Sequence, residues 1–139
     1  MSDQGTFERI EDSSEQRMFG PRAVLVCGLT AEEQETMAAL LASFDDLPLS
    51  VAGPDDLDRP VGDLLSRPSG TGVGQDSTLA RAIILSGLMH RELHEIMQAY
   101  KKTALSRPLW AALTPTSKAW PLKDLLAELN AERTALDKR

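Results

Sequence analysis

The sequence predicts an α/β fold: a small three-layer sandwich with about four mostly parallel strands and flanking helices, of the flavodoxin or receiver type. Two observations lead to this prediction. Continuous apolar runs, such as residues 22–29 and 79–88, are typical of strands buried on both faces of a sheet. Segments with apolar residues at helical spacing follow these runs, and such alternation favours right-handed crossovers in a mainly parallel sheet.

The length of 139 residues suits one domain. We expect a flexible acidic arm over residues 1–20, with a marginal helical turn near residues 7–10, and a single α/β domain over residues 21–137. The arm begins "MSDQGTFERIEDSSEQ" and lacks the basic start and apolar stretch of a secretion signal.

The first apolar run, residues 22–29, predicts a strand, and a helix is expected directly after it. Thr30 is the expected N-cap and Glu33 lies three residues later, which is the spacing of a capping box. Met37, Leu40, Leu41 and Phe44 recur at helical spacing and form the expected buried face. Residues 48–52 predict a second strand, and a Gly-Pro pair ends it.

The second half of the chain repeats this alternation. After a short possible helix within residues 57–67, the apolar run 79–88 predicts a third strand and residues 88–102 a helix. Residues 107–115 predict a fourth strand. Residues 121–139 predict the last helix, with Pro121 at its first position and Leu122, Leu125, Leu126, Leu129 and Leu136 facing inward.

The stretch "RPSGTGVGQDST", residues 67–78, raises the question of a phosphate-binding loop. A P-loop needs a strand before it, a helix after it and a lysine near its end. Here Gln75 and Asp76 stand where the lysine would be, and a strand follows instead of a helix. We therefore expect a disordered linker near residues 66–78, because Gly and Ser enrichment is typical of flexible connections.

Composition excludes several classes of partner. The net charge of −6 and the sequence pI of about 4.9 argue against nucleic-acid binding and against anionic membranes. Cys27 is the single cysteine, so an internal disulfide is excluded and a reducing cytoplasm is the expected setting. No apolar run reaches the roughly 18 residues that cross a bilayer. We expect no cofactor.

Possible reactive side chains have simpler interpretations. His90 and His94 share a helix face, but no third ligand is evident, so we expect no metal site. Cys27 lies in a strand and is expected to be an inert core thiol. Ser86 lacks the surrounding G-x-S-x-G of a nucleophile, and we expect it to cap the following helix. No catalytic residue is predicted.

Polar side chains after the strands predict where contacts are made. In open α/β sheets, ligands bind at the carboxyl ends of the strands. The stretch "LTPTSKAW" follows the fourth strand, and a tryptophan there is either an amphipathic anchor or a core residue. The candidate binding residues at this edge are Thr30, Ser86, Thr114, Thr116, Ser117 and Trp120.

Two resemblances add to these expectations. The pair "VLVCGLTAEE" and "RPLWAALTPTSKAWPLKDLLAELNAER", within residues 23–133, is similar to an uncharacterised bacterial family of small α/β proteins known only as a domain of unknown function. It implies the fold and a bacterial cytoplasmic setting, but no activity. More weakly, residues 82–115 resemble a degenerate response-regulator receiver domain, in which Thr114 matches the threonine position and Ser86 falls near the aspartate position.

The functional expectation follows from the absence of reaction chemistry. We expect a non-enzymatic regulatory or protein-interaction domain, with an unknown protein partner or self-association. The alternative is a small-molecule-binding protein or enzyme that uses the loops at the carboxyl edge of the sheet. A concave pocket with convergent polar groups at that edge would favour the alternative.

Overall fold

The computed structural model describes residues 17–137, so most of the predicted arm lies outside the described residues. Four strands form one sheet in the order β2–β1–β3–β4. β1 pairs in parallel with β2, and β3 pairs in parallel with β4, whereas the central pair β1–β3 is antiparallel. The strands are β1 (Ala23–Cys27), β2 (Leu49–Ala52), β3 (Ala82–Ser86) and β4 (Leu109–Ala112).

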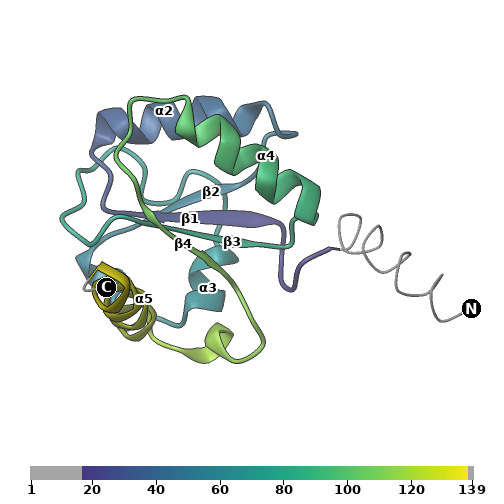
Figure 1. Cartoon of the computed structure of the whole chain (residues 1–139). Helices are drawn as coiled ribbons and strands as arrows, with labels where there is room; N and C mark the ends of the chain where they lie inside the picture. Colours follow the sequence, from purple (N-terminus) through teal and green to yellow (C-terminus); the bar gives the residue numbers. More distant parts are fainter. Residues whose placement is uncertain (1–16, 138–139) are drawn as a thin grey trace, which may run out of the picture.

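Helices cover both faces of the sheet, which confirms the predicted three-layer α/β architecture (Figure 1). On one face lie α2 (Ala31–Ala42) and α4 (His90–Lys101). On the other face lie α3 (Val61–Leu65) and α5 (Leu122–Asp137), together with the short turns η1 (Pro54–Asp56) and η2 (Ser117–Ala119).

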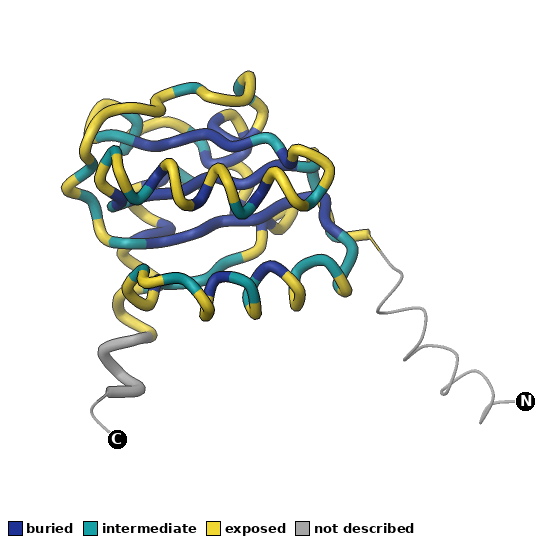
Figure 2. Tube along the Cα trace, turned by 90° about the horizontal axis from the view of Figure 1, so that it is seen from above, coloured by how far each residue is buried: buried dark blue, intermediate teal, exposed yellow. Residues whose placement is uncertain are grey.

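The period of two along each strand divides the core into two halves. Val24 and Val26 point to the α2–α4 side, whereas Leu25 and Cys27 point to the α3–α5 side. All four are fully buried, and Figure 2 shows the strands as the buried centre of the molecule. Burying an aliphatic side chain of this size contributes about 1.5–3 kcal/mol, so these continuous apolar runs stabilise a sheet covered on both faces.

From β1 to α5, the described residues form two βαβα units related by an approximate two-fold axis. The first runs β1–α2–β2–α3 and the second β3–α4–β4–α5. Their first strands pair antiparallel about Leu25 and Ile84, which are equivalent positions in the two units. The isolated bridge between Pro60 and Pro121 obeys the same symmetry, because these residues precede α3 and α5 respectively.

Two ion pairs repeat across this axis. Arg22 precedes β1 and contacts Glu92 at the start of α4, with 2.7 Å between Nη1 and Oε1. Arg81 precedes β3 and contacts Glu33 at the start of α2, with 2.8 Å between Nη2 and Oε1. Each glutamate therefore joins its own helix to the residue that precedes the first strand of the other unit.

Two glycines allow the close approach of the units. Gly28 and Gly87 end β1 and β3 with positive φ angles of 78° and 68°. A Cβ atom on Gly28 would lie 2.5 Å from the carbonyl oxygen of Leu79, and one on Gly87 would lie 2.5 Å from the amide nitrogen of Arg22. A side chain at either position would displace the backbone of the other unit.

The glycine-rich loop has a defined course, which differs from the expected disordered linker. Gly70 donates to the carbonyl of Leu49 at 2.7 Å, and Val51 donates to the carbonyl of Thr71 at 2.8 Å. Residues 69–72 therefore lie along the outer edge of β2. The composition of the loop indicates flexibility in isolation, but it does not reveal that an edge strand offers hydrogen-bond partners to its backbone.

Residues 17–20 pack against the turn between β3 and α4. Met18 donates to the carbonyl of Leu88 at 2.7 Å, and Gly87 donates to the carbonyl of Phe19 at 3.1 Å. The end of the predicted arm is therefore joined to the domain. Among the helices described, none has the length and apolar character needed to cross a membrane.

Candidate functional site

The antiparallel centre of the sheet separates the residues that the sequence placed at one binding edge. Thr30 lies just after the carboxyl end of β1. Ser86 ends β3 and Thr114 follows β4, so these two residues lie at the same edge of the sheet. Because β1 and β3 run in opposite directions, their carboxyl ends lie at opposite edges of the sheet. Thr30 therefore does not join the other five candidates, and the expected common edge after the first, third and fourth strands is wrong.

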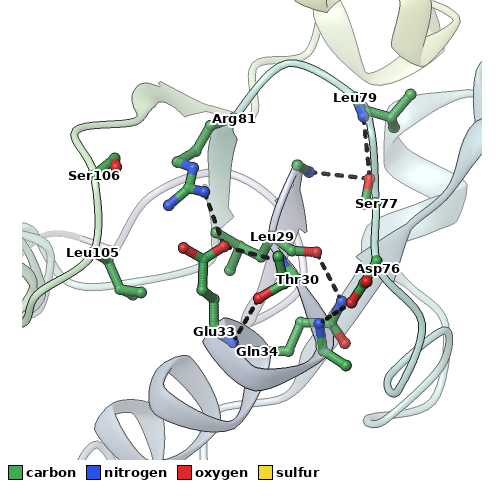
Figure 3. Close-up of polar contacts among 12 residues, drawn as sticks. Leu29, Thr30, Glu33, Gln34, Asp76, Ser77, Leu79, Arg81, Leu105 and Ser106 are labelled. Atoms are coloured by element: carbon green, nitrogen blue, oxygen red, sulfur yellow. Dashed lines mark hydrogen bonds and ion pairs between the residues drawn. The ribbon is translucent and has the colours of Figure 1, made fainter.

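The Thr30 end is a network of hydrogen bonds around the start of α2 (Figure 3). The predicted capping box is confirmed: Glu33 donates its amide to Thr30 Oγ1 at 3.1 Å, and Thr30 donates its amide to Glu33 Oε1 at 2.9 Å. Asp76 accepts from the amide of Ala31 at 2.7 Å. The amides at this helix end are thus met by two carboxylates and one hydroxyl of the protein itself.

Electrostatics fix the protonation state of this network. The hydrogen bond from the Thr30 amide, assisted by Arg81, lowers the pKa of Glu33 below its usual value. The Arg22 guanidinium and the Met89 amide lower the pKa of Glu92 in the equivalent position. Both glutamates are charged at neutral pH and serve to join the two units.

Ser86 does not cap α4, which corrects the sequence prediction. Met89 is the N-cap residue of α4, and its amide is met by Glu92. Ser86 is fully buried and donates its hydroxyl to the carbonyl of Pro21. The residue lies inside the strand, where the nearby chain segment of the first unit offers an acceptor, so its side chain is committed to a structural bond.

The hydroxyls of Thr114 and Ser117 bond to each other and to each other's backbone. Ser117 donates its amide to Thr114 Oγ1 at 2.9 Å, and Thr114 donates its amide to Ser117 Oγ at 3.1 Å. Their two hydroxyl oxygens lie 3.1 Å apart. This arrangement lies at the start of the turn η2, where Ser117 is buried whereas Thr114 and Thr116 are exposed.

Trp120 is in part a core residue, and its recognition role stays a prediction. Its side chain is half-buried and packs against the α3–α5 half of the core. Its remaining surface borders a shallow hollow on α5 with Asp124, Ala127 and Glu128. The residue is therefore a core anchor whose outer side faces an acidic part of α5.

A larger pocket lies between the end of α4 and the start of β4, where the sequence predicted no site. Its volume is about 560 Å³. We call it the α4–β4 pocket; it is lined by Met97, Tyr100, Lys101, Leu105, Arg107, Pro108 and Trp110. The rings of Tyr100 and Trp110 meet edge to face in it, with centroids 5.3 Å apart.

The segment that closes the pocket is held by the end of α4. Tyr100 donates its hydroxyl to the carbonyl of Ser106 at 2.6 Å, and Thr103 donates its hydroxyl to the carbonyl of Tyr100 at 2.7 Å. Burial raises the pKa of the Tyr100 phenol, and the nearby Arg81 partly offsets that rise. Tyr100 is therefore a neutral donor that fixes the wall of the pocket.

The pocket lies in the one long stretch of this acidic chain without carboxylate side chains. No Asp or Glu occurs between Glu95 and Asp124, although the stretch contains Lys101, Lys102, Arg107, Lys118 and Lys123. The exposed Lys101 and Arg107 border the pocket itself. This gap in acidic residues, rather than any motif, is the sequence signal that could have indicated the pocket.

Side chains suited to covalent or metal chemistry are not gathered in the described structure. Burial raises the pKa of Cys27 to about 12, so its thiol stays protonated in the core. Within residues 17–137, no group of three or more His, Cys, Asp or Glu side chains converges on one point. His94 lies on the exposed side of α4.

Residues 81–136 match the model of a family described as a domain of unknown function, DUF3783. The match confirms the expected similarity to an uncharacterised family. It covers the second βαβα unit, from the residue before β3 into α5, and not the first unit. Neither a curated protein nor a solved structure matches the chain.

Proposed function

We propose that this chain is a non-enzymatic protein-interaction domain, with a regulatory role, that binds its partner at the α4–β4 pocket. The observation that carries this proposal is the joint occurrence of aromatic, apolar and cationic side chains at one recess of an acidic surface. Trp110, backed by the buried Tyr100, provides a rigid aromatic wall, and Lys101 and Arg107 provide charge at the rim. Aromatic residues and arginine are enriched where protein interfaces gain their binding energy.

The chemistry of the other polar groups supports a binding role over a catalytic one. Ser86, Thr114 and Ser117 use their hydroxyls in hydrogen bonds within the protein. Cys27 is buried and protonated. A nucleophile needs a free hydroxyl or thiolate and a neighbouring base. The three hydroxyls are already bonded within the protein, and the thiol stays protonated.

A photocrosslinking experiment tests the proposal. A photoreactive amino acid replaces Met97 in the pocket or, in a separate variant, Ala127 on α5. We expect the Met97 variant to crosslink a specific partner in cells and the Ala127 variant to crosslink none. Arg107→Glu should remove the crosslink, and the matched reversal Lys118→Glu, on η2 away from the pocket, should leave it. Equal crosslinking from both positions, or crosslinking unaffected by Arg107→Glu, contradicts the proposal.

The pocket volume supports a second candidate, a small anionic molecule as ligand. The volume of about 560 Å³ lies in the range of small-molecule sites, and two aromatic rings with two cations suit an anion with a planar group. Thermal unfolding with a panel of aromatic carboxylates tests it. A rise in Tm that Arg107→Glu abolishes supports this candidate, and an unchanged Tm across the panel excludes it.

A further inference from the structure

The two-fold relation between the units allows the outer edges of β2 and β4, and the recesses beside them, to be compared. The α2–β2 groove of the first unit includes Ala38, Leu41, Ala42 and Leu49. The α4–β4 pocket places Met97, Tyr100, Lys101 and Trp110 at the equivalent positions. The first three residues of each set lie equally far along the chain from the glycine that ends the first strand of their unit, Gly28 or Gly87. The fourth residues, Leu49 and Trp110, pair with Val24 of β1 and Ile83 of β3, which are equivalent positions.

In the first unit, the glycine-rich loop occupies both the α2–β2 groove and the outer edge of β2. Ser69, Gly70 and Val73 of the glycine-rich loop form the outer wall of the α2–β2 groove. The loop bonds to the outward groups of β2: Gly70 donates to Leu49 and Val51 donates to Thr71. An extended backbone therefore lies beside β2 and partly fills the groove above it.

The second unit offers the same groups without such a segment. Leu109 and Leu113 donate their amides to Arg81 and Leu85 of β3, at 3.0 Å and 2.9 Å. Because successive residues of a strand point their backbone groups to opposite sides, those of Trp110 and Ala112 point to the outer edge. These are the equivalents of Leu49 and Val51. Over residues 17–137, no segment pairs with this edge of β4.

Charge distinguishes the occupant of the second unit from that of the first. Where the α2–β2 groove has Ala42, the α4–β4 pocket has Lys101, and Arg107 adds a second cation beside it. An edge-to-edge second copy would bring the α4 helices to the same side of a continuous sheet, as α2 and α4 are here. Two cationic pockets would then face each other, which disfavours self-pairing and favours an anionic partner.

We infer that the α4–β4 pocket binds an extended acidic segment of a partner protein, which adds to β4 as a fifth strand. The backbone of that segment bonds to Trp110 and Ala112, and its glutamate or aspartate side chains contact Lys101 and Arg107. An apolar residue of the segment enters the pocket beside Met97, in the place that corresponds to Val73. This inference rests on the proposed protein-interaction function and specifies the partner's chemistry and mode of binding.

The test uses the full chain and a short labelled peptide in which glutamate alternates with threonine around a central valine. We expect saturable binding that weakens with added salt. On binding, hydrogen exchange at the amides of Trp110 and Ala112 should slow by about tenfold or more, whereas the amides of Leu109 and Leu113 are already bonded to β3. The same peptide with lysine in place of glutamate should not bind.

Variants separate charge from strand pairing. Arg107→Glu should weaken the affinity for the peptide by about tenfold, and Lys118→Glu should change that affinity by no more than about twofold. Ala112→Pro removes an outward amide without removing a bond to β3, so it should abolish binding while Tm changes little. If that variant is unfolded, two peptides replace it, each N-methylated at alternate residues but in opposite phase. Only the peptide whose unmethylated amides face β4 should bind.

The outcomes distinguish this inference from the proposed function. Peptide binding without slowed exchange at Trp110 and Ala112 overturns strand addition. Failure of the acidic peptide, while the Met97 crosslink to a partner persists, overturns the acidic class but leaves the interaction site in place. Peptide binding that appears only after residues 1–16 are deleted identifies the chain's own acidic arm as the occupant and overturns a partner segment.

Discussion

The indole of Trp110 meets the phenol ring of Tyr100 edge to face, with centroids 5.3 Å apart and ring planes inclined by 80°. This contact joins β4 to α4 at the wall of the α4–β4 pocket. Aromatic pairs in this geometry contribute about 0.5–1.5 kcal/mol beyond the area that they bury.

A double-mutant cycle measures this contact. Tyr100→Leu and Trp110→Leu should each reduce the free energy of unfolding, and the double variant should lose about 0.5–1.5 kcal/mol less than the sum of the two. Urea unfolding of the four proteins gives the coupling. The matched cycle of Tyr100 with Trp120, which lies in the other half of the core, should be additive within about 0.5 kcal/mol. Equal coupling in both cycles would show that the ring contact has no specific role.

The glycine-rich loop should contribute to stability through one close approach. Gly72 has a φ angle of 80°, and a Cβ atom there would lie 2.2 Å from the carbonyl oxygen of Val51. Gly74 also has a positive φ, 107°, but a Cβ atom there meets nothing within 4 Å. We expect Gly72→Ala to cost about 2 kcal/mol more than Gly74→Ala in the free energy of unfolding, because only the former displaces the loop from β2.

A replacement of the whole loop decides between the linker interpretation and the edge-covering interpretation. Replacement of residues 69–77 by a Gly/Ser linker should cost more than about 2 kcal/mol. It removes the hydrogen bond that the Leu49 amide donates to Ser69 Oγ and the one that the Gly74 amide donates to Gln34 Oε1. A small and equal effect of both alanine substitutions and of the replacement would restore the flexible-linker prediction.

The Arg22–Glu92 pair should make stability depend on pH in the acid range. The pKa of Glu92 is lowered in the folded protein, so its contribution is complete above the unfolded-state pKa of about 4.3 and is lost as pH falls through the folded-state pKa. Glu92→Gln should therefore cost about 1 kcal/mol at pH 7 and nothing at low pH, where the wild-type carboxyl is also neutral.

Unfolding midpoints from pH 7 to pH 2 measure this dependence. Glu95→Gln, an exposed position on the same helix, is the matched control and should leave the pH profile nearly unchanged. A Glu92→Gln profile parallel to the wild-type profile would mean that the pair with Arg22 contributes no net stability.

Trp120→Ala should destabilise the protein by about 2–3 kcal/mol, which is less than the full cost of removing a buried tryptophan. The reason is that Trp120 packs against the α3–α5 half of the core but keeps part of its surface exposed. Trp120→Phe, which retains most of the packing, should cost about 1 kcal/mol. A loss below about 0.5 kcal/mol for Trp120→Ala would contradict the anchor role and favour recognition.

Much of this fold follows from local sequence. Thr30 and Glu33 form their capping box because the bonds lie within one turn of chain. The apolar runs of β1 and β3 are buried on both faces, and Met37 of α2 and Ile96 of α4 are buried on the helix faces that pack against the sheet. Each of these features depends on the periods of the helix and strand, which are properties of neighbouring residues.

The tertiary structure alone decided which ends of the strands meet. A continuous apolar run reads the same in either direction, so the sequence of β3 determined that it is buried but not that it lies antiparallel to β1. The connection through residues 53–81 is long enough to return the chain to either edge of the sheet. That single orientation placed Thr30 opposite Ser86, laid the glycine-rich loop along β2, and set the aromatic and cationic residues of the α4–β4 pocket beside the outer edge of β4, because each of these depends on contacts between residues far apart in the chain.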